Sequence, residues 1–374
     1  MNVICLFQPQ SSNRKITMNH LGISDQSGDK LNQRFSRRIV IAVLCLILLS
    51  GILGWRIRQQ GWQKFKNSLL FANQPRKRNL QPPRQEFDFS NSVIPPGEIQ
   101  HGGPPKDGIP ALSNPEFLTI SDAEYLKPDD RVISVMAGKE ARAYPLKILN
   151  YHEIVNDRIG ETPIAVTYCP LCDSSVVFDR RTTAGEREFG VSGLLFNSNV
   201  LMYDRGSPQE SLWSQLMTAG VAGPGAKQKL KTFPLEVTTW KDWASRYPDG
   251  KVLSDQTGHA RDYRSSPYQP YFETPQLIFP VKHVDKRLPA KTPVLGVWNG
   301  TKAIAFPLNR LSIENPLSRE TINGKNFEVR FNPQSKGLQV LNAEDGVEWM
   351  YTFWFAWAAF HPQTEIYGSE KGTN

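Results

Sequence analysis

Two cysteines three residues apart are the groups in this sequence best suited to chemistry. Cys169 and Cys172 enclose a Pro-Leu pair and stand between two apolar, β-branched segments, IAVTY and SSVVF. A strand–turn–strand setting offers no helix N-terminus to lower a thiol pKa, as happens where a Cys-x-x-Cys motif opens a helix. A Cys-Pro-x-Cys turn between strands is instead typical of a metal knuckle, in which two thiolates project toward one ion.

A metal at this turn needs ligands from elsewhere, because the chain has four cysteines and the other two lie near its N-terminus. His152 is the nearest candidate, and Met202 offers a soft thioether. Two thiolates, an imidazole and a thioether suit copper or zinc, and the residue types do not separate these metals. His259 and His361 are weaker candidates, and we expect His361 to be a packing residue.

The cysteine pair also has two metal-free interpretations. It could cycle between dithiol and disulfide in a thiol–disulfide oxidoreductase. It could instead be a structural bridge in a ligand-binding or scaffold module. In the second case the binding candidates are the polar and aromatic residues after the turn, Asp204, Arg205, Trp213 and Gln215. The first two also fit a structural ion pair. No P-loop, dinucleotide fingerprint or nucleophile elbow is present, so no nucleotide cofactor is indicated.

An internal repeat is the clearest long-range pattern. Residues 132–149 match residues 294–311 at an offset of 162, with eight of eighteen positions identical. Average composition gives roughly one identity. Two further matches follow in the same order, 164–179 with 327–342 and 240–252 with 354–366. Three blocks in one order predict a duplicated module.

The offset between the copies changes from 163 to 114, a difference of 49 residues. We therefore expect copy 1 at about residues 131–253, with an insert at about 183–232, and copy 2 at about 293–367. In copy 2, Asn332 and Ser335 replace the two cysteines. The chemistry thus belongs to copy 1, and copy 2 is expected to be structural support.

Local patterns indicate a mixed α+β, β-rich fold. VISVMAG and EARAY read as a hairpin around a glycine, and VNDRIGETPIAVTY reads as a second hairpin. FGVSG and NVLMYDR in the insert read as two strands. Short helices are expected at LKILNYHEI, after Pro145, and at TTWKDWASRYP, capped by Thr238 or Thr239.

The N-terminal part predicts a membrane anchor. Residues 39–55 form an uncharged run of 17 residues that ends in Trp55, and we place the anchor at 39–57. A basic, disordered head is expected over residues 1–38 and a proline-rich linker over 58–96, leaving 97–374 as the folded body. Four basic residues flank the run on each side, so charge does not fix its orientation. We expect a single-pass cell-membrane protein with an extracytoplasmic body.

The net charge of +8 does not indicate nucleic-acid binding. Residues 1–94 hold 14 Lys and Arg against 4 Asp and Glu, which leaves 30 against 32 for the rest of the chain. The basic residues therefore belong to the N-terminal tether, where they suit lipid headgroups. Nucleic-acid binding needs a basic face on the folded domain, and we expect none.

Six ordered motifs resemble a known family. They are GGPPKDGIPAL, YPLKILNYHEIVND, TYCPLCDSSVVFD, FGVSG, DRGSPQESLWSQ and WFAWAAFHP, and the resemblance covers about residues 97–368. Together they resemble the domain of unknown function 3179 family of bacteria and archaea. The resemblance implies an exported or membrane-anchored protein without assigning an activity. The family usually has glycine after the second cysteine, where this chain has Asp173.

From the cysteine turn, its candidate ligands and the predicted anchor, we expect a membrane-anchored metal-binding or metal-dependent redox protein centred on this turn.

Overall fold

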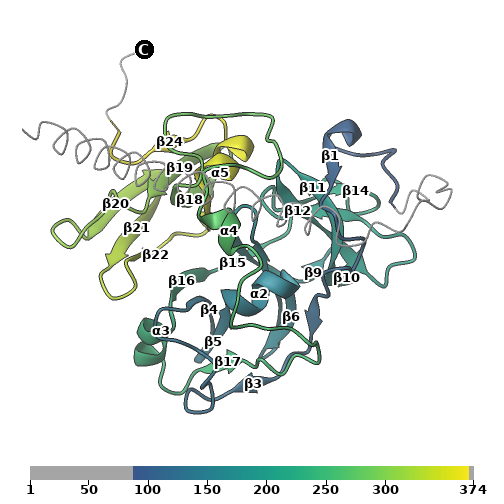
Figure 1. Cartoon of the computed structure of the whole chain (residues 1–374). Helices are drawn as coiled ribbons and strands as arrows, with labels where there is room; N and C mark the ends of the chain where they lie inside the picture. The colour runs from purple at the N-terminus through teal and green to yellow at the C-terminus, as the bar shows by residue number, and fades with distance from the viewer. Residues whose placement is uncertain (1–86, 370–374) are drawn as a thin grey trace, which may run out of the picture. The chain divides into compact units, whose positions relative to one another are not determined.

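The computed structural model describes residues 87–369 as a β-rich body with a few short helices (Figure 1). The predicted mixed α+β, mostly sheet fold class is confirmed. The predicted basic head, the anchor and residues 58–86 of the linker lie outside the described residues. Within residues 87–369, none of the helices combines the length and the apolar character needed to cross a membrane.

The first predicted hairpin lies in a five-stranded sheet of order β16-β4-β5-β17-β3. β4 (Arg131–Ala137) and β5 (Glu140–Pro145) flank a turn in which Gly138 has a φ of 60°. The other strands are β16 (Leu235–Thr239), β17 (Lys251–Leu253) and β3 (Phe117–Leu118). The predicted helix α3 (Trp240–Arg246) follows β16, and the Thr239 side chain caps it by accepting from the Asp242 amide.

The cysteine turn lies in a nine-stranded sheet of order β2-β6-β7-β8-β23-β18-β19-β24, with β15 beside β8. Its strands are β2 (Leu112–Ser113), β6 (Ile154–Ile159), β7 (Thr162–Cys169), β8 (Ser174–Asp179), β15 (Thr232–Phe233), β18 (Pro293–Asn299), β19 (Lys302–Pro307), β23 (Glu348–Phe353) and β24 (Glu365–Ile366). The second predicted hairpin is β6–β7, and α2 (Leu146–His152) is the predicted helix before it. β8 meets β23 at the pair Ser175–Tyr351, which joins strands from both ends of the body.

The predicted insert builds most of a third sheet, of order β1-β11-β12-β13-β14. Its strands are β1 (Ile99–His101), β11 (Glu188–Phe196), β12 (Asn199–Arg205), β13 (Leu212–Ser214) and β14 (Ala219–Ala222), and β9 (Arg181–Thr182) with β10 (Gly185–Glu186) forms a separate pair. A 3-10 turn, η1 (Pro96–Glu98), precedes β1. Phe87 and Ile94, inside the predicted linker, are buried against this sheet, so packed structure begins before residue 97.

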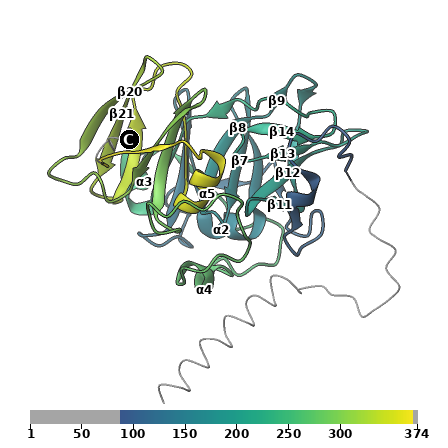
Figure 2. The same cartoon turned by 90° about the horizontal axis from the view of Figure 1, so that it is seen from above.

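A three-stranded sheet completes the body. It contains β20 (Leu317–Ile322), β21 (Lys325–Asn332) and β22 (Gly337–Leu341). Figure 2 shows β20 and β21 at one end of the body and β11–β13 at the other, with β7 and β8 between them. α5 (Trp354–Phe360) follows β23.

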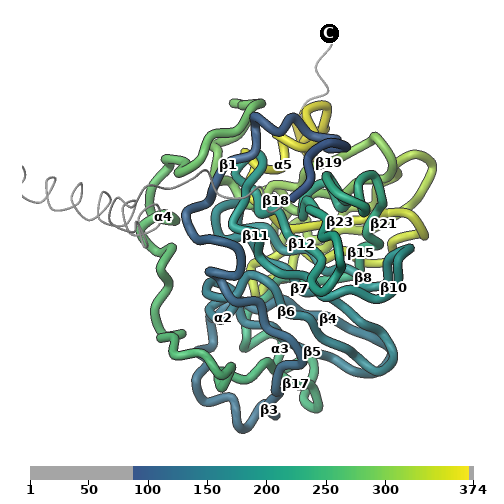
Figure 3. Tube along the Cα trace, turned by 90° about the vertical axis from the view of Figure 1, so that its right-hand side faces the viewer, coloured from purple at the N-terminus to yellow at the C-terminus, as the bar shows by residue number. Residues whose placement is uncertain are grey.

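A long segment with little regular structure connects β17 to β18. It contains only α4 (Gln269–Phe272) and runs along the outside of the body past α2 (Figure 3). Tyr151 on α2 donates to the Ser265 carbonyl at 3.2 Å, which fixes the segment beside that helix. The segment therefore covers the region where α2 meets the cysteine-bearing strands.

Strand registers recur between the two ends of the body at the offsets found in the sequence. Val132 pairs with Pro145 in β4–β5, and Val294 pairs with Pro307 in β18–β19, 162 residues later. The pairs Cys169–Ser174 and Asn332–Gly337 are related in the same way at an offset of 163. After α3 and α5, the parallel pairs Val252–Ala143 and Ile366–Ala305 recur too, Ile366 lying 114 residues after Val252.

The tryptophans on α3 and α5 pack against different kinds of residue on the neighbouring strands. The Trp243 indole N–H donates to Ser134 Oγ at 2.9 Å. At the corresponding position, 162 residues later, Gly296 lies directly beneath the Trp357 ring, and a Cβ there would lie 2.2 Å from a ring carbon. The second helix therefore packs against bare backbone.

We predict that Gly296→Ala lowers the free energy of unfolding by about 1–3 kcal/mol, because the fully buried Trp357 ring must shift to admit a methyl group. Urea unfolding monitored by tryptophan fluorescence measures the change. Gly97→Ala is the control, since a Cβ at that position would have no atom within 4 Å, and it should change stability by no more than about 0.5 kcal/mol. Equal midpoints for the two variants would contradict the packing described.

Candidate functional site

The cysteine turn is a tight knuckle between β7 and β8. The Cys172 amide donates to the Cys169 carbonyl at 3.1 Å, and Asp173 follows with a φ of 48°. That left-handed conformation explains why glycine is expected at this position. Here the aspartate is held by its side chain, because Tyr168 Oη lies 2.8 Å and Arg131 Nη1 3.0 Å from its carboxylate. The departure from glycine therefore leaves the turn intact.

The two thiols are free, buried and unequal. Burial opposes ionisation of Cys169, but hydrogen bonds from the Cys172 thiol and from the amides of Cys172, Val200 and Leu171 outweigh it and lower the pKa of Cys169. Burial and the neighbouring Cys169 raise the pKa of Cys172 well above its usual value. Cys169 is therefore the group that ionises first, and Cys172 remains a thiol.

Both sulfur atoms face one carbonyl in the turn between β11 and β12. Cys172 Sγ lies 3.3 Å and Cys169 Sγ 4.0 Å from the Ser198 carbonyl oxygen. Ser198 itself has a φ of 68°, and its hydroxyl donates to the Phe279 carbonyl. The predicted insert thus supplies the surface that the thiols contact.

A buried polar network fixes the insert to the knuckle, and Gln215 is at its centre. Gln215 Oε1 accepts from Ser174 Oγ at 2.6 Å and from Asn199 Nδ2 at 2.8 Å, while its Nε2 donates to Thr167 Oγ1 at 2.9 Å. All four side chains are buried. Such a network specifies one arrangement, because breaking it leaves buried polar groups without partners. Gln215 therefore positions the site from inside the protein.

The structure adds a carboxyl group that the sequence analysis missed. Glu153 ends α2 with a φ of 58° and is buried, at 6% exposure. Its carbonyl accepts from the Tyr168 amide at 2.7 Å, which places it beside the end of β7. Burial and the nearby Cys169 raise the pKa of Glu153 well above its usual value, which favours the protonated form of the carboxyl group. The unusual φ of a non-glycine residue could not be read from the sequence.

Glu153 lines a cavity of about 200 Å³ next to the cysteine turn. The walls are mostly apolar and come from the end of α2, the β11–β12 hairpin and the coil segments near residues 104 and 267. Leu171, in the middle of the knuckle, and Val200, whose amide donates to Cys169, are among them. These two residues therefore connect the cavity wall to the turn, because the amides of both also donate to Cys169.

His152 lies next to Glu153, yet both of its ring nitrogens are occupied. Nδ1 is 2.7 Å from the Pro110 carbonyl, and Nε2 is 2.6 Å from Tyr263 Oη. The His259 ring lies 5.2 Å away. Burial lowers the pKa of His152 to about 4, so the neutral ring is a structural connector between three segments. Metal binding by His152 through Nε2 would require its hydrogen bond with Tyr263 to break.

The remaining candidates divide into two groups. Met202 and Trp213 are buried in the same apolar core as both cysteines, with Trp213 edge-on to Phe189 at 5.9 Å. Asp204 and Arg205 serve the loops at the far end of β12, where Asp204 accepts from the Ser211 amide and Arg205 pairs with Asp107 at 2.5 Å. The structure thus places Arg205 in an ion pair with Asp107, Trp213 in the core that contains the cysteines, and Gln215 in contact with Ser174 at the end of the turn.

No group of three or more His, Cys, Asp and Glu side chains suited to holding a metal occurs within residues 87–369. His361, the other histidine considered, stacks on Trp357 at 3.9 Å between ring centroids, as expected of a packing residue. The thiol pair therefore has soft neighbours and no third charged or imidazole ligand in the described part of the chain.

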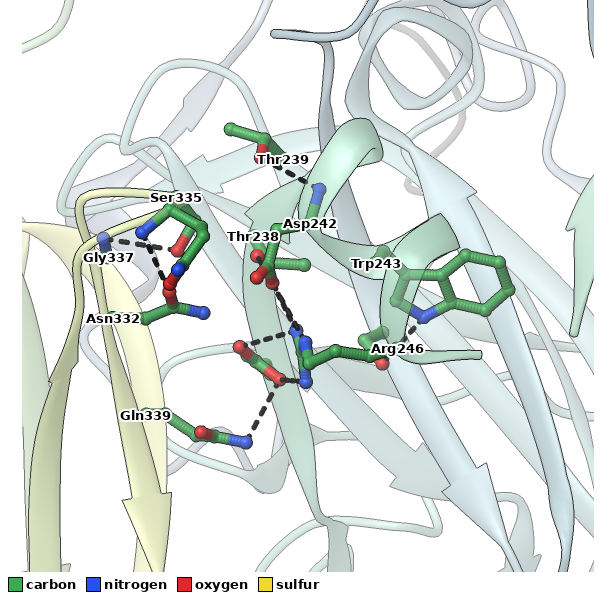
Figure 4. A network of polar contacts seen from close by, with 12 residues as sticks. Thr238, Thr239, Asp242, Trp243, Arg246, Asn332, Ser335, Gly337 and Gln339 are labelled. Carbon is green, nitrogen blue, oxygen red and sulfur yellow. Dashed lines mark hydrogen bonds and ion pairs between the residues drawn. The ribbon is translucent and has the colours of Figure 1, made fainter. Parts of the chain in front are cut away.

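The turn at the corresponding position, Asn332 to Ser335, has different surroundings. It packs against α3, where Arg246 forms ion pairs with Asp242 and Glu236, and Gln339 donates to Glu236 at 3.2 Å (Figure 4). Burial opposes ionisation of Asp242, but hydrogen bonds from Thr238, Asn332 and Arg246 lower its pKa. The turn from Asn332 to Ser335 is thus stabilised by an ionic network.

The cysteine turn lacks that network. The residues 114 positions after Glu236, Asp242 and Arg246 are Met350, Ala356 and Phe360, all apolar. Met350 and Ala356 belong to the buried core that contains both cysteines. Any charge on Cys169 is consequently balanced by backbone N–H groups rather than by a salt bridge.

Comparison with known proteins gives one finding. A family profile described as "Protein of unknown function (DUF3179)" matches residues 106–349. No curated protein and no solved structure matches the chain.

We predict that acid destabilises the fold partly through His152. Its folded pKa of about 4 lies below the ordinary 6.5, so unfolding takes up a proton as the pH falls through this range. The contribution of His152 is fully present above about pH 6.5 and is lost toward pH 4. His152→Gln should therefore show a smaller fall in urea midpoint between pH 7 and pH 4.5 than the parent. His101→Gln, an exposed control, should behave like the parent; an equal fall in all three proteins would contradict the assignment.

Proposed function

The chain belongs to the DUF3179 family, and we propose that its Cys169–Cys172 pair is a dithiol–disulfide redox centre. This proposal is based on the opposite pKa shifts of the two thiols. Cys169 collects three backbone N–H donors and the Cys172 thiol, whereas Cys172 is held as a thiol. An attacking thiolate beside a second, protonated thiol is the arrangement that a two-step thiol exchange requires.

The reaction transfers two electrons from the pair to an oxidant. The Cys169 thiolate attacks the oxidant and forms a covalent S–X bond, and the leaving group departs with a proton. Cys172 then attacks Cys169 sulfur, expels the second fragment and closes the Cys169–Cys172 disulfide. The two thiol protons end on the two fragments, so atoms and electrons balance.

Burial restricts the oxidant to small molecules. Cys169 is 1% exposed and Cys172 is fully buried, which excludes attack on a disulfide at the surface of a folded partner. The neighbouring cavity offers an approach, since Leu171 of the cysteine turn lines it. A small-molecule substrate therefore fits this centre better than a protein substrate.

A soft-metal centre is the second candidate, because both sulfur atoms point to one place and Met202 lies in the same core. Two thiolates with a thioether suit copper in its reduced form better than zinc, for which a harder third ligand is usual. His152 does not support this candidate, since both of its nitrogens are engaged.

We also infer that the body arose by duplication and that residues 39–57 anchor it in the membrane with the body outside the cytoplasm. Recurring registers at the sequence offsets support the duplication. The uncharged run of 17 residues ending in Trp55 supports the anchor. An oxidising compartment would provide oxidants for a dithiol.

We predict that the two single-cysteine variants differ. In Cys172→Ser, the remaining Cys169 should be alkylated by iodoacetamide and should retain a mixed disulfide with a small aromatic disulfide reagent. In Cys169→Ser, the buried Cys172 should react at least about tenfold more slowly, because its thiolate is disfavoured. Intact-protein mass spectrometry follows both reactions. Equal reactivity of the two variants would overturn the assignment of roles.

Elemental analysis of the full chain, purified without chelator, separates the redox and metal candidates. The redox proposal predicts less than about one tenth of an equivalent of copper or zinc in the parent. One equivalent in the parent that disappears in Cys169→Ser plus Cys172→Ser, and persists in His152→Gln, would select the metal centre.

A further inference from the structure

The cavity beside the cysteine turn contains a polar atom that the described residues leave without a hydrogen-bond partner. This atom is Asn150 Oδ1, which is buried on a side chain with 8% exposure. The buried Glu153 carboxyl group lines the same cavity. A buried polar atom without a partner is unfavourable, so Asn150 indicates a ligand with a hydrogen-bond donor.

The remaining walls define the shape and polarity of that ligand. Leu171, Val191, Leu195 and Phe279 contribute apolar surface, and the volume is about 200 Å³. Arg261, Tyr151 and Tyr268 also line the cavity. An apolar cavity of about 150 Å³ holds benzene, so the site accepts a molecule of about six to ten non-hydrogen atoms. Gly193 closes one side: it has a φ of 78°, and a Cβ there would lie 2.3 Å from the Pro104 carbonyl.

The hydrogen bonds that Asn150 and Glu153 can form narrow the class of ligand further. Asn150 Oδ1 needs a donor from the ligand, and the Glu153 carboxyl group, in the protonated form that its burial favours, donates to an oxygen. Among small two-electron oxidants, disulfides and quinones have no such donor, and hydrogen peroxide has no apolar part for the walls. An organic hydroperoxide has an O–H donor, an accepting oxygen and an apolar body.

We propose that this cavity binds small organic hydroperoxides, with the O–OH group between Asn150 and Glu153 and the apolar body against Leu195 and Phe279. This inference rests on the proposed redox function and names its oxidant. The Cys169 thiolate attacks the terminal oxygen, so that an S–O bond forms and the O–O bond breaks. The alkoxide takes a proton from the Glu153 carboxyl group and leaves as an alcohol, and Glu153 regains the proton that Cys169 released on forming its thiolate.

The pair completes the reaction without another reactant. The Cys172 thiol attacks the sulfenic acid of Cys169, an S–S bond forms, and the oxygen leaves as water. Two thiols and one hydroperoxide thus give one disulfide, one alcohol and one water. Cys169 itself is 1% exposed, so the cavity wall at Leu171 and Val200, whose amides donate to Cys169, must move slightly for the attack.

The test mixes the reduced full chain with tert-butyl hydroperoxide and follows loss of free thiols by mass spectrometry. The parent should form the Cys169–Cys172 disulfide, and Cys172→Ser should form a sulfenic acid that dimedone traps. Asn150→Leu should lower the second-order rate constant by about tenfold, because the hydroperoxide loses its acceptor. Asn309→Leu, at an exposed asparagine outside this cavity, is the matched control and should react like the parent.

Two results would overturn the inference, and they are distinguishable. If tert-butyl hydroperoxide leaves the thiols unchanged while a small aromatic disulfide reagent still produces the Cys169–Cys172 disulfide, the redox function stands and the hydroperoxide site is wrong. If neither reagent produces the disulfide in folded protein, both proposals fail. Equal rates for the parent and Asn150→Leu would also show that the cavity does not bind the oxidant.

Discussion

The carbonyl group of Cys172 accepts two hydrogen bonds from the other end of the body, from the Phe353 amide at 2.8 Å and from Thr352 Oγ1 at 3.2 Å. These bonds continue the single strand pair Ser175–Tyr351, through which β8 and β23 become neighbours in one sheet. Without this junction the nine-stranded sheet would divide into two parts. The knuckle is therefore a structural joint as well as a chemical site, and its backbone cannot move freely during a reaction.

The two related turns show how one backbone geometry supports different roles. In both, the residue after the turn has a left-handed conformation, Asp173 with φ 48° and Lys336 with φ 53°. The turn at Asn332 lies on an ionic network with Asp242, whereas the cysteine turn faces apolar side chains. Low polarity around a thiol raises its pKa, so the thiolate of Cys169 depends on the Cys172 thiol and on the N–H groups directed at it. The turn itself supplies the N–H groups of Leu171 and Cys172, and β12 supplies that of Val200.

The insert and α2 complete the site from opposite sides. Both occur only in the first half of the described body, since the segment after β19 forms turns where α2 would be expected. α2 delivers Glu153 to the cavity, and the β11–β12 hairpin delivers the Val200 amide and the Ser198 carbonyl to the thiols. The elements that distinguish the halves are thus the same elements that surround the cysteines.

Local patterns in the sequence determined the hairpins, the cap at Thr239 and the position of Cys169 and Cys172 between strands, because alternation and turn residues act over a few neighbouring positions. They also brought Gln215 and Met202 into consideration, both of which lie close to the turn or in its core. Only the tertiary structure decided that His152 is a structural residue, because its hydrogen-bond partner Tyr263 is 111 residues away in the sequence. It likewise decided the burial of Glu153 and the separation of Arg205 from the thiols. Burial and partner choice depend on which distant segments pack together, and a single sequence carries no local signal for that packing.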